Sequence, residues 1–235
     1  MNKFILNFII TILILAGSGQ AGEMTPAPEA KTTNKKEAGK VKEHKSGEWS
    51  PMLDNAEKET LFAITTATLE WCVKGGEGSF SFDKYTITPK LKVPTHTFVT
   101  LKIKGGLRGC IGSLPPMSPD PLCKSVHENA INAASRDYRF PQVTERELKD
   151  IDVHISLLSP VKAIASLDEF IIGKHGIIFR KGRNRSVFLP EVAVEQNWTK
   201  EDTLTHLSMK AGLEQDAWRS GAEFEVFESV VLMHE

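Results

Sequence analysis

The chain has 235 residues, of which 40% are hydrophobic and 25% are charged, proportions that are ordinary for a globular protein. Its 29 basic and 30 acidic side chains give a formal net charge of -1, which excludes the strongly basic footprint of a dedicated nucleic-acid-binding protein. A mean hydropathy of -0.21 excludes a polytopic membrane protein, and three cysteines are too few for a disulfide scaffold.

The first 21 residues have the features of a secretory signal peptide. Lys3 is followed by an apolar run over residues 4–16 and by small residues at 17–19. The run is shorter than the roughly 18–20 apolar residues that span a membrane. We therefore predict cleavage after Ala21 and an exported protein, periplasmic or extracellular. The alternative is an uncleaved anchor that contacts the membrane; Ser18 stands where a lipoprotein would need cysteine.

Residues 22–49 are expected to form a disordered tether. The segment interleaves glutamate with lysine and contains Pro26 and Pro28 but almost no large apolar side chain. Such a segment cannot bury enough apolar surface to offset its ordering entropy. The globular domain is therefore predicted to occupy residues 50–235, which is enough chain for one sizeable core.

The elements of this domain are predicted from periodicity and turn residues. Ser50-Pro51 is expected to open a helix whose apolar stripe runs from Leu61 to Cys72 and stops at Gly75-Gly76. The later elements are expected in this order: strands over 97–104 and 107–114, a helix over 118–135, strands over 151–158, 176–180 and 186–189, helices from 190 and over 199–211, and a strand over 223–232. Without regular strand–helix–strand alternation, this order predicts an α+β fold, an antiparallel sheet flanked by helices.

The segment from Gly105 to Leu114 is the strongest candidate for a functional site. Four glycines surround Cys110 within a predicted strand, where glycine is costly and usually marks a bulge or a close backbone approach. Strand alternation predicts Arg108 and Cys110 on one face, and a guanidinium beside a thiol favours the nucleophilic thiolate. A reactive Cys110 in a glycine-lined pocket and a buried Cys110 in a tightly packed hairpin fit these residues equally well.

Six motifs in this order resemble the AMMECR domain, in the form named AmmeMemoRadiSam system protein A: LRGCIGSL, ENAINAASRDYRFPQVT, IDVHISLLSP, GKHGI, FLPEVAVEQNW and KAGLEQDAWR. The resemblance covers about residues 55–235. It implies an α+β domain of two subdomains, the larger one built on an antiparallel sheet. It also implies a gene-neighbour association with a Memo-family protein and a radical SAM enzyme, without supplying an established reaction.

The resemblance carries signature positions onto residues 107–112, Arg139-Phe140-Pro141, His175-Gly176 and Leu189-Pro190-Glu191. Cys110 is therefore predicted as the nucleophile or ligand-gripping thiol, with Arg108 as its electrostatic partner. His175 and Glu191 are predicted acid–base helpers, with turn chemistry and helix-dipole stabilisation as their structural alternatives. The residues predicted to support the motif are Leu107, Gly109, Gly112, Arg139 and Pro141.

Two classes of function fit these residues. In the first, an enzyme-like domain uses a pocket at the LRGCIG hairpin. In the second, a protein-interaction module recruits a partner, and the glycines and Arg139-Phe140-Pro141 support packing. The partner implied by the resemblance is a Memo-family protein. An exported chain would not meet a cytosolic radical SAM enzyme directly.

The remaining candidates are weaker. His127 follows Cys123 by four residues on a predicted helix, where the two side chains share a face, and His154 is expected to point into solvent. The sequence has no CxxC, HxH or HExxH pattern, so neither a metal nor another cofactor is predicted. The basic run 180–185 is expected to be a solvated turn, and no nucleic-acid partner is predicted. All three cysteines are expected to be reduced.

Overall fold

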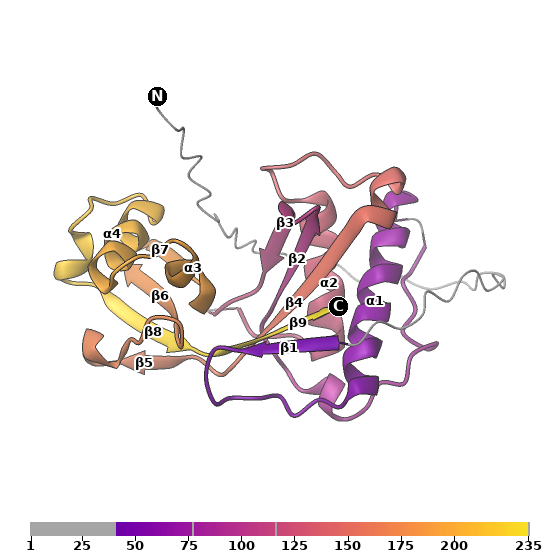
Figure 1. Cartoon of the computed structure of the whole chain (residues 1–235), viewed down its shortest axis with the longest axis horizontal. Coiled ribbons are helices and arrows are strands. Elements are labelled where there is room, and N and C mark those ends of the chain that lie inside the picture. Colours follow the sequence, from indigo (N-terminus) through magenta and orange to yellow (C-terminus); the bar gives the residue numbers. More distant parts are fainter. Residues whose placement is uncertain (1–40, 77, 116, 235) are drawn as a thin grey trace.

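Two antiparallel sheets organise the described residues, 41–76, 78–115 and 117–234, of this computed structural model (Figure 1). The first sheet has the strand order β1-β9-β4-β2-β3 and the second β5-β8-β6-β7. The elements are β1 (Val41–Lys45), α1 (Asn55–Val73), β2 (Thr97–Ile103), β3 (Gly106–Gly112), α2 (Leu122–Ser135), β4 (Ile151–Leu158), β5 (Lys162–Ile164), β6 (Gly176–Lys181), β7 (Asn184–Phe188), α3 (Pro190–Glu195), α4 (Lys200–Lys210), β8 (Glu223–Phe227) and β9 (Ser229–His234). The predicted α+β class is confirmed. No helix among these residues is long and apolar enough to cross a membrane.

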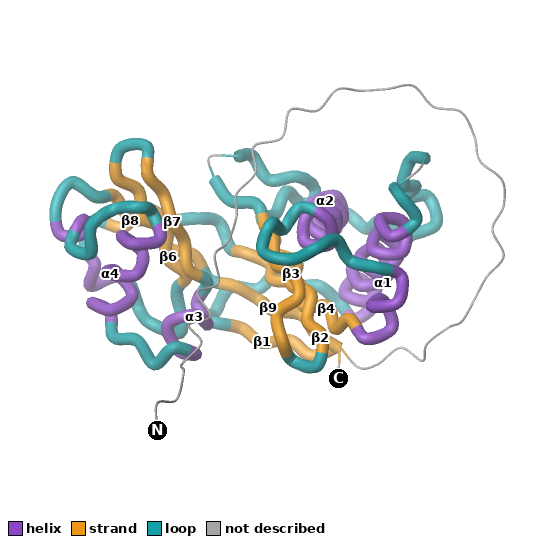
Figure 2. Tube along the Cα trace, turned by 90° about the horizontal axis from the view of Figure 1, so that it is seen from above, coloured by secondary structure: helices purple, strands orange, loops and turns teal. Residues whose placement is uncertain are grey.

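Helices α1 and α2 cover one face of the first sheet, whereas α3 lies on the other side of that sheet, towards the second (Figure 2). Helix α1 begins at a capping box in which Asp54 Oδ1 accepts from the Glu57 N–H and Glu57 Oε2 accepts from the Asp54 N–H, both at 2.9 Å. The predicted start at Ser50-Pro51 is therefore wrong. The reciprocal Asp54–Glu57 pair satisfies two helix N–H groups, which a proline at the first position does not do.

The first described strand, β1, begins at Val41, inside the segment expected to be a tether through residue 49. Strand β1 pairs antiparallel with β9, from Val41 opposite His234 to Lys45 opposite Val230. On the α1 side, Glu43 forms an ion pair with Lys58 of the helix, at 2.6 Å. A partner strand from the far end of the chain therefore orders a polar segment whose own composition gives no sign of it. Residues 1–40, which include the predicted signal peptide, lie outside the described residues.

The last predicted strand, over residues 223–232, is two strands that belong to different sheets. The division falls at Glu228, whose N–H donates to Ser159 Oγ at 2.9 Å. Ser159 itself lies between β4 and β5, and its N–H donates to the Glu228 carbonyl at 2.9 Å. Two chain segments therefore pass from one sheet to the other side by side, and Figure 1 shows β8 and β9 in yellow linking them.

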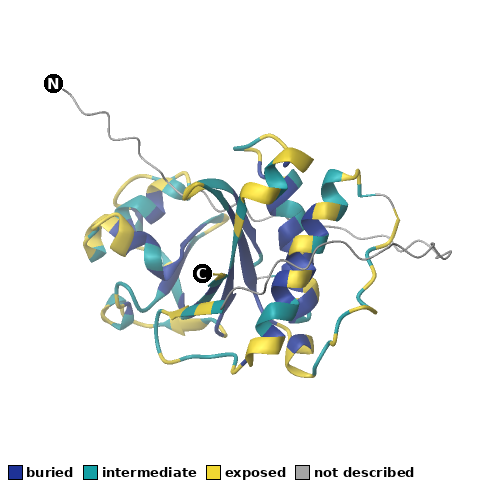
Figure 3. Ribbon diagram, turned by 45° about the vertical axis from the view of Figure 1, so that its right-hand side comes forward, coloured by how far each residue is buried: buried dark blue, intermediate teal, exposed yellow. Residues whose placement is uncertain are grey.

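Buried apolar side chains form two clusters. Figure 3 colours the buried positions along the ribbon dark blue. The first lies between the first sheet and α1 and α2 and includes Leu61, Ile64, Leu101, Val126, Ile155 and Leu232. The second surrounds the second sheet and α4 and includes Phe170, Phe179, Phe188, Leu207 and Phe227. Phe98 of β2 and Cys110 of β3 belong to this second cluster. Part of the face of the first sheet opposite α1 and α2 therefore packs against the second sheet and its helices.

Candidate functional site

The face of the first sheet opposite α1 and α2 carries a row of polar side chains. Cys110 of β3 pairs with Thr100 of β2, and Thr100 pairs with His154 of β4. His154 in turn pairs with Met233 of β9. Residues directly opposite each other in antiparallel strands have their side chains on one face. The fold therefore assembles a floor from the β2–β3 hairpin and from two strands, β4 and β9, that lie far from it in the sequence.

Helix α3 forms the wall above this floor. Pro190 occupies the first helical turn, where a proline is pre-organised for the helix. Glu191 and Glu195, one turn apart, line a cavity of about 340 Å³ together with Cys110 and His154. An adjoining cavity of about 350 Å³ shares both glutamates, His154 and Lys102. We name these two cavities together the cleft.

Glu191 is the acidic group of the cleft whose pKa is most strongly shifted. Its side chain is half-buried, and burial raises the pKa of its carboxyl to about 7, because the charged form loses solvation. The negative charge of Glu195 raises this pKa further, whereas a hydrogen bond to the backbone of Glu191 and the positive charge of Lys102 act in the opposite direction. A carboxyl with this pKa is partly protonated at neutral pH.

Cys110 lies in the floor as a buried thiol. Its exposed fraction is 2%, and its Sγ is 3.1 Å from Thr100 Oγ1. Burial raises the pKa of the thiol, and the hydrogen bond with Thr100 and the positive charge of Arg139 offset part of that effect. The neutral thiol is therefore the favoured form, unlike the activated thiolate of the sequence-based hypothesis.

Arg108 does not share a face with Cys110, so that prediction is wrong. The register shifts between Leu101, which pairs with Gly109, and Lys102, which pairs with Leu107. Arg108 is the extra residue of this β-bulge, and a bulge breaks the alternation of side chains along a strand. Its Nε donates to Glu147 Oε1 at 2.6 Å, and this pairing lowers the pKa of Glu147 to about 2. Glu147 belongs to a short 3₁₀ helix, η2 (Glu145–Asp150).

The guanidinium that contacts Cys110 is that of Arg139, which bonds the backbone of Cys110 at the outer edge of β3. The Cys110 N–H donates to Asp137 Oδ2 at 2.9 Å, and Arg139 Nη2 donates to the Cys110 carbonyl at 3.2 Å. Arg139 and Asp137 also form an ion pair, with 2.6 Å between Nη2 and Oδ2. The loop after α2 thus satisfies the edge of the sheet with a buried charge pair. Sequence reasoning missed Asp137; its signal was the Asp-x-Arg spacing inside the RDYRFP motif.

The other predicted motif residues have mainly packing roles. A Cβ at Gly109 would lie 2.3 Å from the Ala133 carbonyl oxygen of α2. A Cβ at Gly112 would lie 2.2 Å from the ring of Phe98. These two glycines therefore permit close approach of a helix and of a ring. Leu107 is half-buried and lines the cleft, whereas Pro141 is exposed in the loop after α2.

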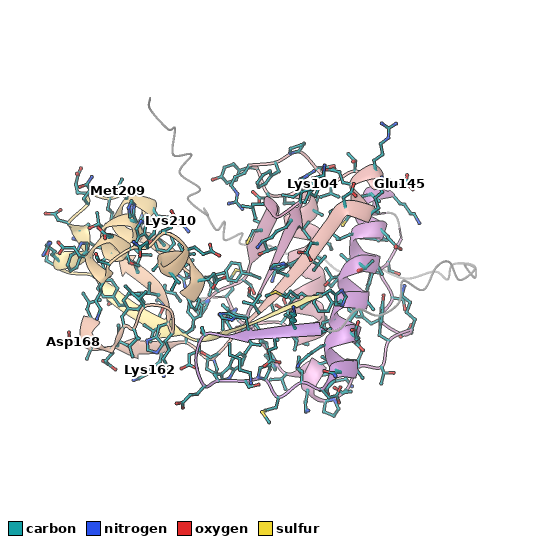
Figure 4. All side chains as sticks on the ribbon, viewed as in Figure 1. Lys104, Glu145, Lys162, Asp168, Met209 and Lys210 are labelled. Carbon is teal, nitrogen blue, oxygen red and sulfur yellow. The ribbon has the colours of Figure 1, made fainter. Side chains whose placement is uncertain are left out.

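His175 is not brought to Cys110, so its predicted role as a helper of that thiol is wrong. Its Nδ1 accepts from the Ile171 N–H at 3.2 Å, and its ring lines a separate cavity of about 370 Å³ with Glu228 and Lys162. In Figure 4, Lys162 lies on the far side of the molecule from Lys104, which marks the tip of the β2–β3 hairpin.

Two further histidines differ from their predicted surroundings. His154, expected to be in solvent, is half-buried in the floor of the cleft and has its Nε2 2.9 Å from Asp152 Oδ2. His127 bonds Thr68 rather than Cys123, with 2.8 Å between Nδ1 and Oγ1. Burial lowers the pKa of His127 to about 4. All three cysteines are free, and no set of metal-ligating side chains occurs within the described ranges.

Comparisons with known proteins agree with the motifs. The AMMECR1 family profile matches residues 63–232. An uncharacterised relative from Methanococcoides burtonii is 37% identical over 185 residues, covering 77% of this chain and 90% of the relative. Another, from Methanothermobacter thermautotrophicus, is 44% identical over 172 residues, covering 71% and 88%. The crystal structure of uncharacterized protein PH0010 from Pyrococcus horikoshii matches with a TM-score of 0.69 at 28% identity, over 77% of this chain and 93% of that one. The chain therefore belongs to the AMMECR1 family.

Proposed function

We propose that this domain binds a small polar metabolite in the cleft and that Glu191 is its acid–base group. The observation that carries the proposal is the position of the Glu191 carboxyl, half-buried at the start of α3 and facing a cavity of about 340 Å³. Its pKa of about 7 suits a group that takes up or releases a proton near neutral pH. Small-molecule sites are concave and contain a few convergent polar groups of this kind.

Proton-detected and carbon-detected NMR tests this proposal. Side-chain carbon signals of glutamate, assigned with Glu191→Gln, are followed from pH 3 to 9, with Glu147 as an internal reference held at low pKa by Arg108. We expect Glu191 to titrate near pH 7 and a metabolite library to yield compounds that shift amide signals of the cleft. An ordinary midpoint near 4.5, together with no compound that shifts a cleft amide, contradicts the proposal.

In this proposal Cys110 contacts the ligand as part of the floor of the cleft and does not attack it. Alkylation tests that role, because iodoacetamide reacts with the thiolate. We expect Cys110 to label more slowly than the half-buried Cys72 in the folded protein, and to match it after denaturation. Fast labelling of Cys110 with a midpoint well below about 8.5 would restore the nucleophile hypothesis. Cys110→Ser is expected to fold and to keep metabolite binding.

A protein-interaction role is the second candidate, and the surface beside β3 favours it. Tyr138 is 67% exposed in the loop whose neighbours Asp137 and Arg139 cap the strand edge. An aromatic side chain held outward on a rigid loop is a typical anchor for a protein partner. A Memo-family protein from the same genome is the partner to test by calorimetry. Loss of its binding in Tyr138→Ala, but not in Glu191→Gln, supports this candidate, and equal binding by both variants contradicts it.

We also propose that the N-terminal 21 residues direct export of the domain. The proposal rests on the apolar run over residues 4–16 and on the small residues that follow it. Intact-mass measurement of the protein from the cell envelope and the medium is the test. A chain that begins at Gly22 is the expected result. A chain that begins at Met1 and remains in the cytosol would overturn it.

A further inference from the structure

Opposite charges face each other across the cleft without touching. Lys102 extends from β2 in the floor, and Glu191 and Glu195 extend from α3 in the wall. Lys102 is near enough for its charge to lower the pKa of Glu191. In the described part of the chain, however, no ion pair of 4.0 Å or less joins Lys102 to either glutamate.

Three half-buried cations elsewhere in the described chain are paired directly with a carboxylate. Arg108 binds Glu147 and Arg139 binds Asp137, each with 2.6 Å between the closest nitrogen and oxygen. Lys58 binds Glu43, also at 2.6 Å. In the cleft, by contrast, Lys102 lines the same cavities as Glu191 and Glu195, and no ion pair between described residues joins it to either glutamate.

The remaining lining complements a carbon skeleton and its polar ends. Leu107, Leu189 and Val231 supply apolar contacts. Thr100 and Ser156 add hydroxyl groups on the floor. A volume of about 340 Å³ lies at the lower end of the roughly 300–1,000 Å³ typical of small-molecule sites. The occupant is therefore a compact molecule with an apolar part.

We propose that the ligand of the cleft is a compact zwitterion, an α-amino acid or a short peptide, with its ammonium group between Glu191 and Glu195 and its carboxylate on Lys102. The inference rests on the proposed function of the cleft and adds the class of its ligand. A cation between the two glutamates relieves their mutual repulsion, and an anion at Lys102 neutralises the cation of the floor. A molecule with only one of these charges leaves either the glutamates of the wall or Lys102 of the floor without a partner.

Matched probes separate the two charges. L-leucine and glycyl-L-leucine are zwitterions, 3-methylbutylamine is leucine without its carboxylate, and 4-methylpentanoate is leucine without its amine. Dissociation constants are measured at pH 7 by amide NMR titration of the full chain. We expect at least one zwitterion to bind tenfold or more tightly than both single-charge probes, which is about 1.4 kcal/mol.

Two variants locate the charges within the cleft. Lys102→Met is expected to reduce the affinity for the zwitterion to that for the amine, while the affinity for the amine stays within twofold. Glu191→Gln is expected to lower the affinity for the zwitterion and for the amine and to leave the affinity for 4-methylpentanoate unchanged. Lys104→Met removes the same charge at the hairpin tip, outside the cavity lining, and should change no affinity. A wild-type amide spectrum outside the cleft verifies folding, and Lys102→Gln replaces Lys102→Met if needed.

The outcomes distinguish this inference from the proposed function. If neither these probes nor a general metabolite library shifts a cleft amide, the proposed function fails and the inference fails with it. If library compounds bind the cleft but the amine or the acid binds as tightly as both zwitterions, the proposed function stands and the inference is overturned. Equal losses of affinity for the zwitterion in Lys102→Met and Lys104→Met also overturn the inference.

Discussion

The two faces of the first sheet use adjacent residues for different purposes. Towards α1 and α2, Leu101 of β2 and Ile155 of β4 are fully buried in an apolar cluster. Their neighbours Lys102 and His154 point the opposite way and line the cleft. An antiparallel sheet with one solvated face commonly shows this alternation. Here the face opposite α1 and α2 meets α3, the helix that follows β7 of the second sheet, and the polar groups of this face still line a cavity.

This difference indicates where the sequence is constrained by stability and where it is constrained by chemistry. The helix side tolerates only side chains that fill space, because cavities and overpacking both destabilise a core. On the cleft side the same strands hold a cation, an imidazole and a thiol. Substitutions on the two faces should therefore separate loss of folding from loss of binding.

The largest effect is expected at the edge where the two faces meet. Asp137→Ala leaves the half-buried Arg139 and the Cys110 N–H without their carboxylate, and breaking a buried pair from one side costs about 3–5 kcal/mol. Urea denaturation measures the loss of unfolding free energy. Asp150→Ala, at an exposed position, is the control and should stay within about 0.5 kcal/mol. Equal losses in the two variants would mean that the edge pair contributes nothing.

A neighbouring pair of substitutions tests the two faces of β4. Ile155→Ala should cost about 2–5 kcal/mol, because it opens a cavity against α1 and α2. His154→Gln should cost less than about 1 kcal/mol and should weaken metabolite binding, since His154 lines the cleft. Denaturation and ligand titration are run on both variants. The comparison breaks down if His154→Gln unfolds the protein or if Ile155→Ala is neutral.

Two glycines of the β2–β3 hairpin test how closely α2 packs against the first sheet. Gly109→Ala should destabilise by about 1–3 kcal/mol, because the new methyl group would meet the Ala133 carbonyl oxygen. At Gly106 the nearest atom would be 3.4 Å from an added Cβ, so Gly106→Ala should change the unfolding free energy by about 0.5 kcal/mol or less. Thermal melts of the two variants measure the difference. A smaller effect at Gly109 would remove the packing explanation of that residue.

The smallest effect expected is a pH dependence from Glu191. Its pKa is about 7 in the folded protein, above the ordinary value of 4.5, so the folded state holds a proton that the unfolded state has lost. Stability is therefore retained below about pH 4.5 and falls as the pH rises towards 7. Glu191→Gln should abolish a fall on the order of 1 kcal/mol, allowing for solvent screening.

The groups facing Glu191 must be considered in that measurement. They are Glu195 on the same helix, Lys102 and His154 on the sheet, and His44 at the end of the cleft. Unfolding curves at pH 5 and pH 8 are recorded for wild type, Glu191→Gln and Glu195→Gln. If the difference between wild type and Glu191→Gln is the same at both pH values, the assignment of this titration to Glu191 is wrong.

Local signals in the sequence were sufficient for most of the helices and strands. The strand Ile151–Leu158 is observed with its predicted bounds, and Thr199 caps α4 through Asp202 as the predicted helix start requires. Such features depend on neighbours a few residues away. The order of the strands within the sheets and the pairing of β1 with β9 depend on distant partners, and no short pattern indicates them.

The candidate site was predicted only in part for the same reason. Cys110 and Glu191 do line one cleft, together with Leu107. Arg108 was misplaced because a bulge in one strand is defined by its register with another. His154 was missed because the face it occupies is covered by α3, a helix that begins 36 residues later in the chain, at Pro190. Site geometry in this protein is thus mainly a property of strand register.

The continuous passage of β8 into β9 has a consequence for synthesis of the chain. Strand β9 lies between β1 and β4 in the first sheet, and β8 lies between β5 and β6 in the second. Both sheets therefore lack an interior strand until residues 223–234 have left the ribosome. Although domains generally begin to fold from the N-terminal side during translation, neither sheet is complete before these residues have emerged. A chain truncated before residue 223 would lack an interior strand in both sheets.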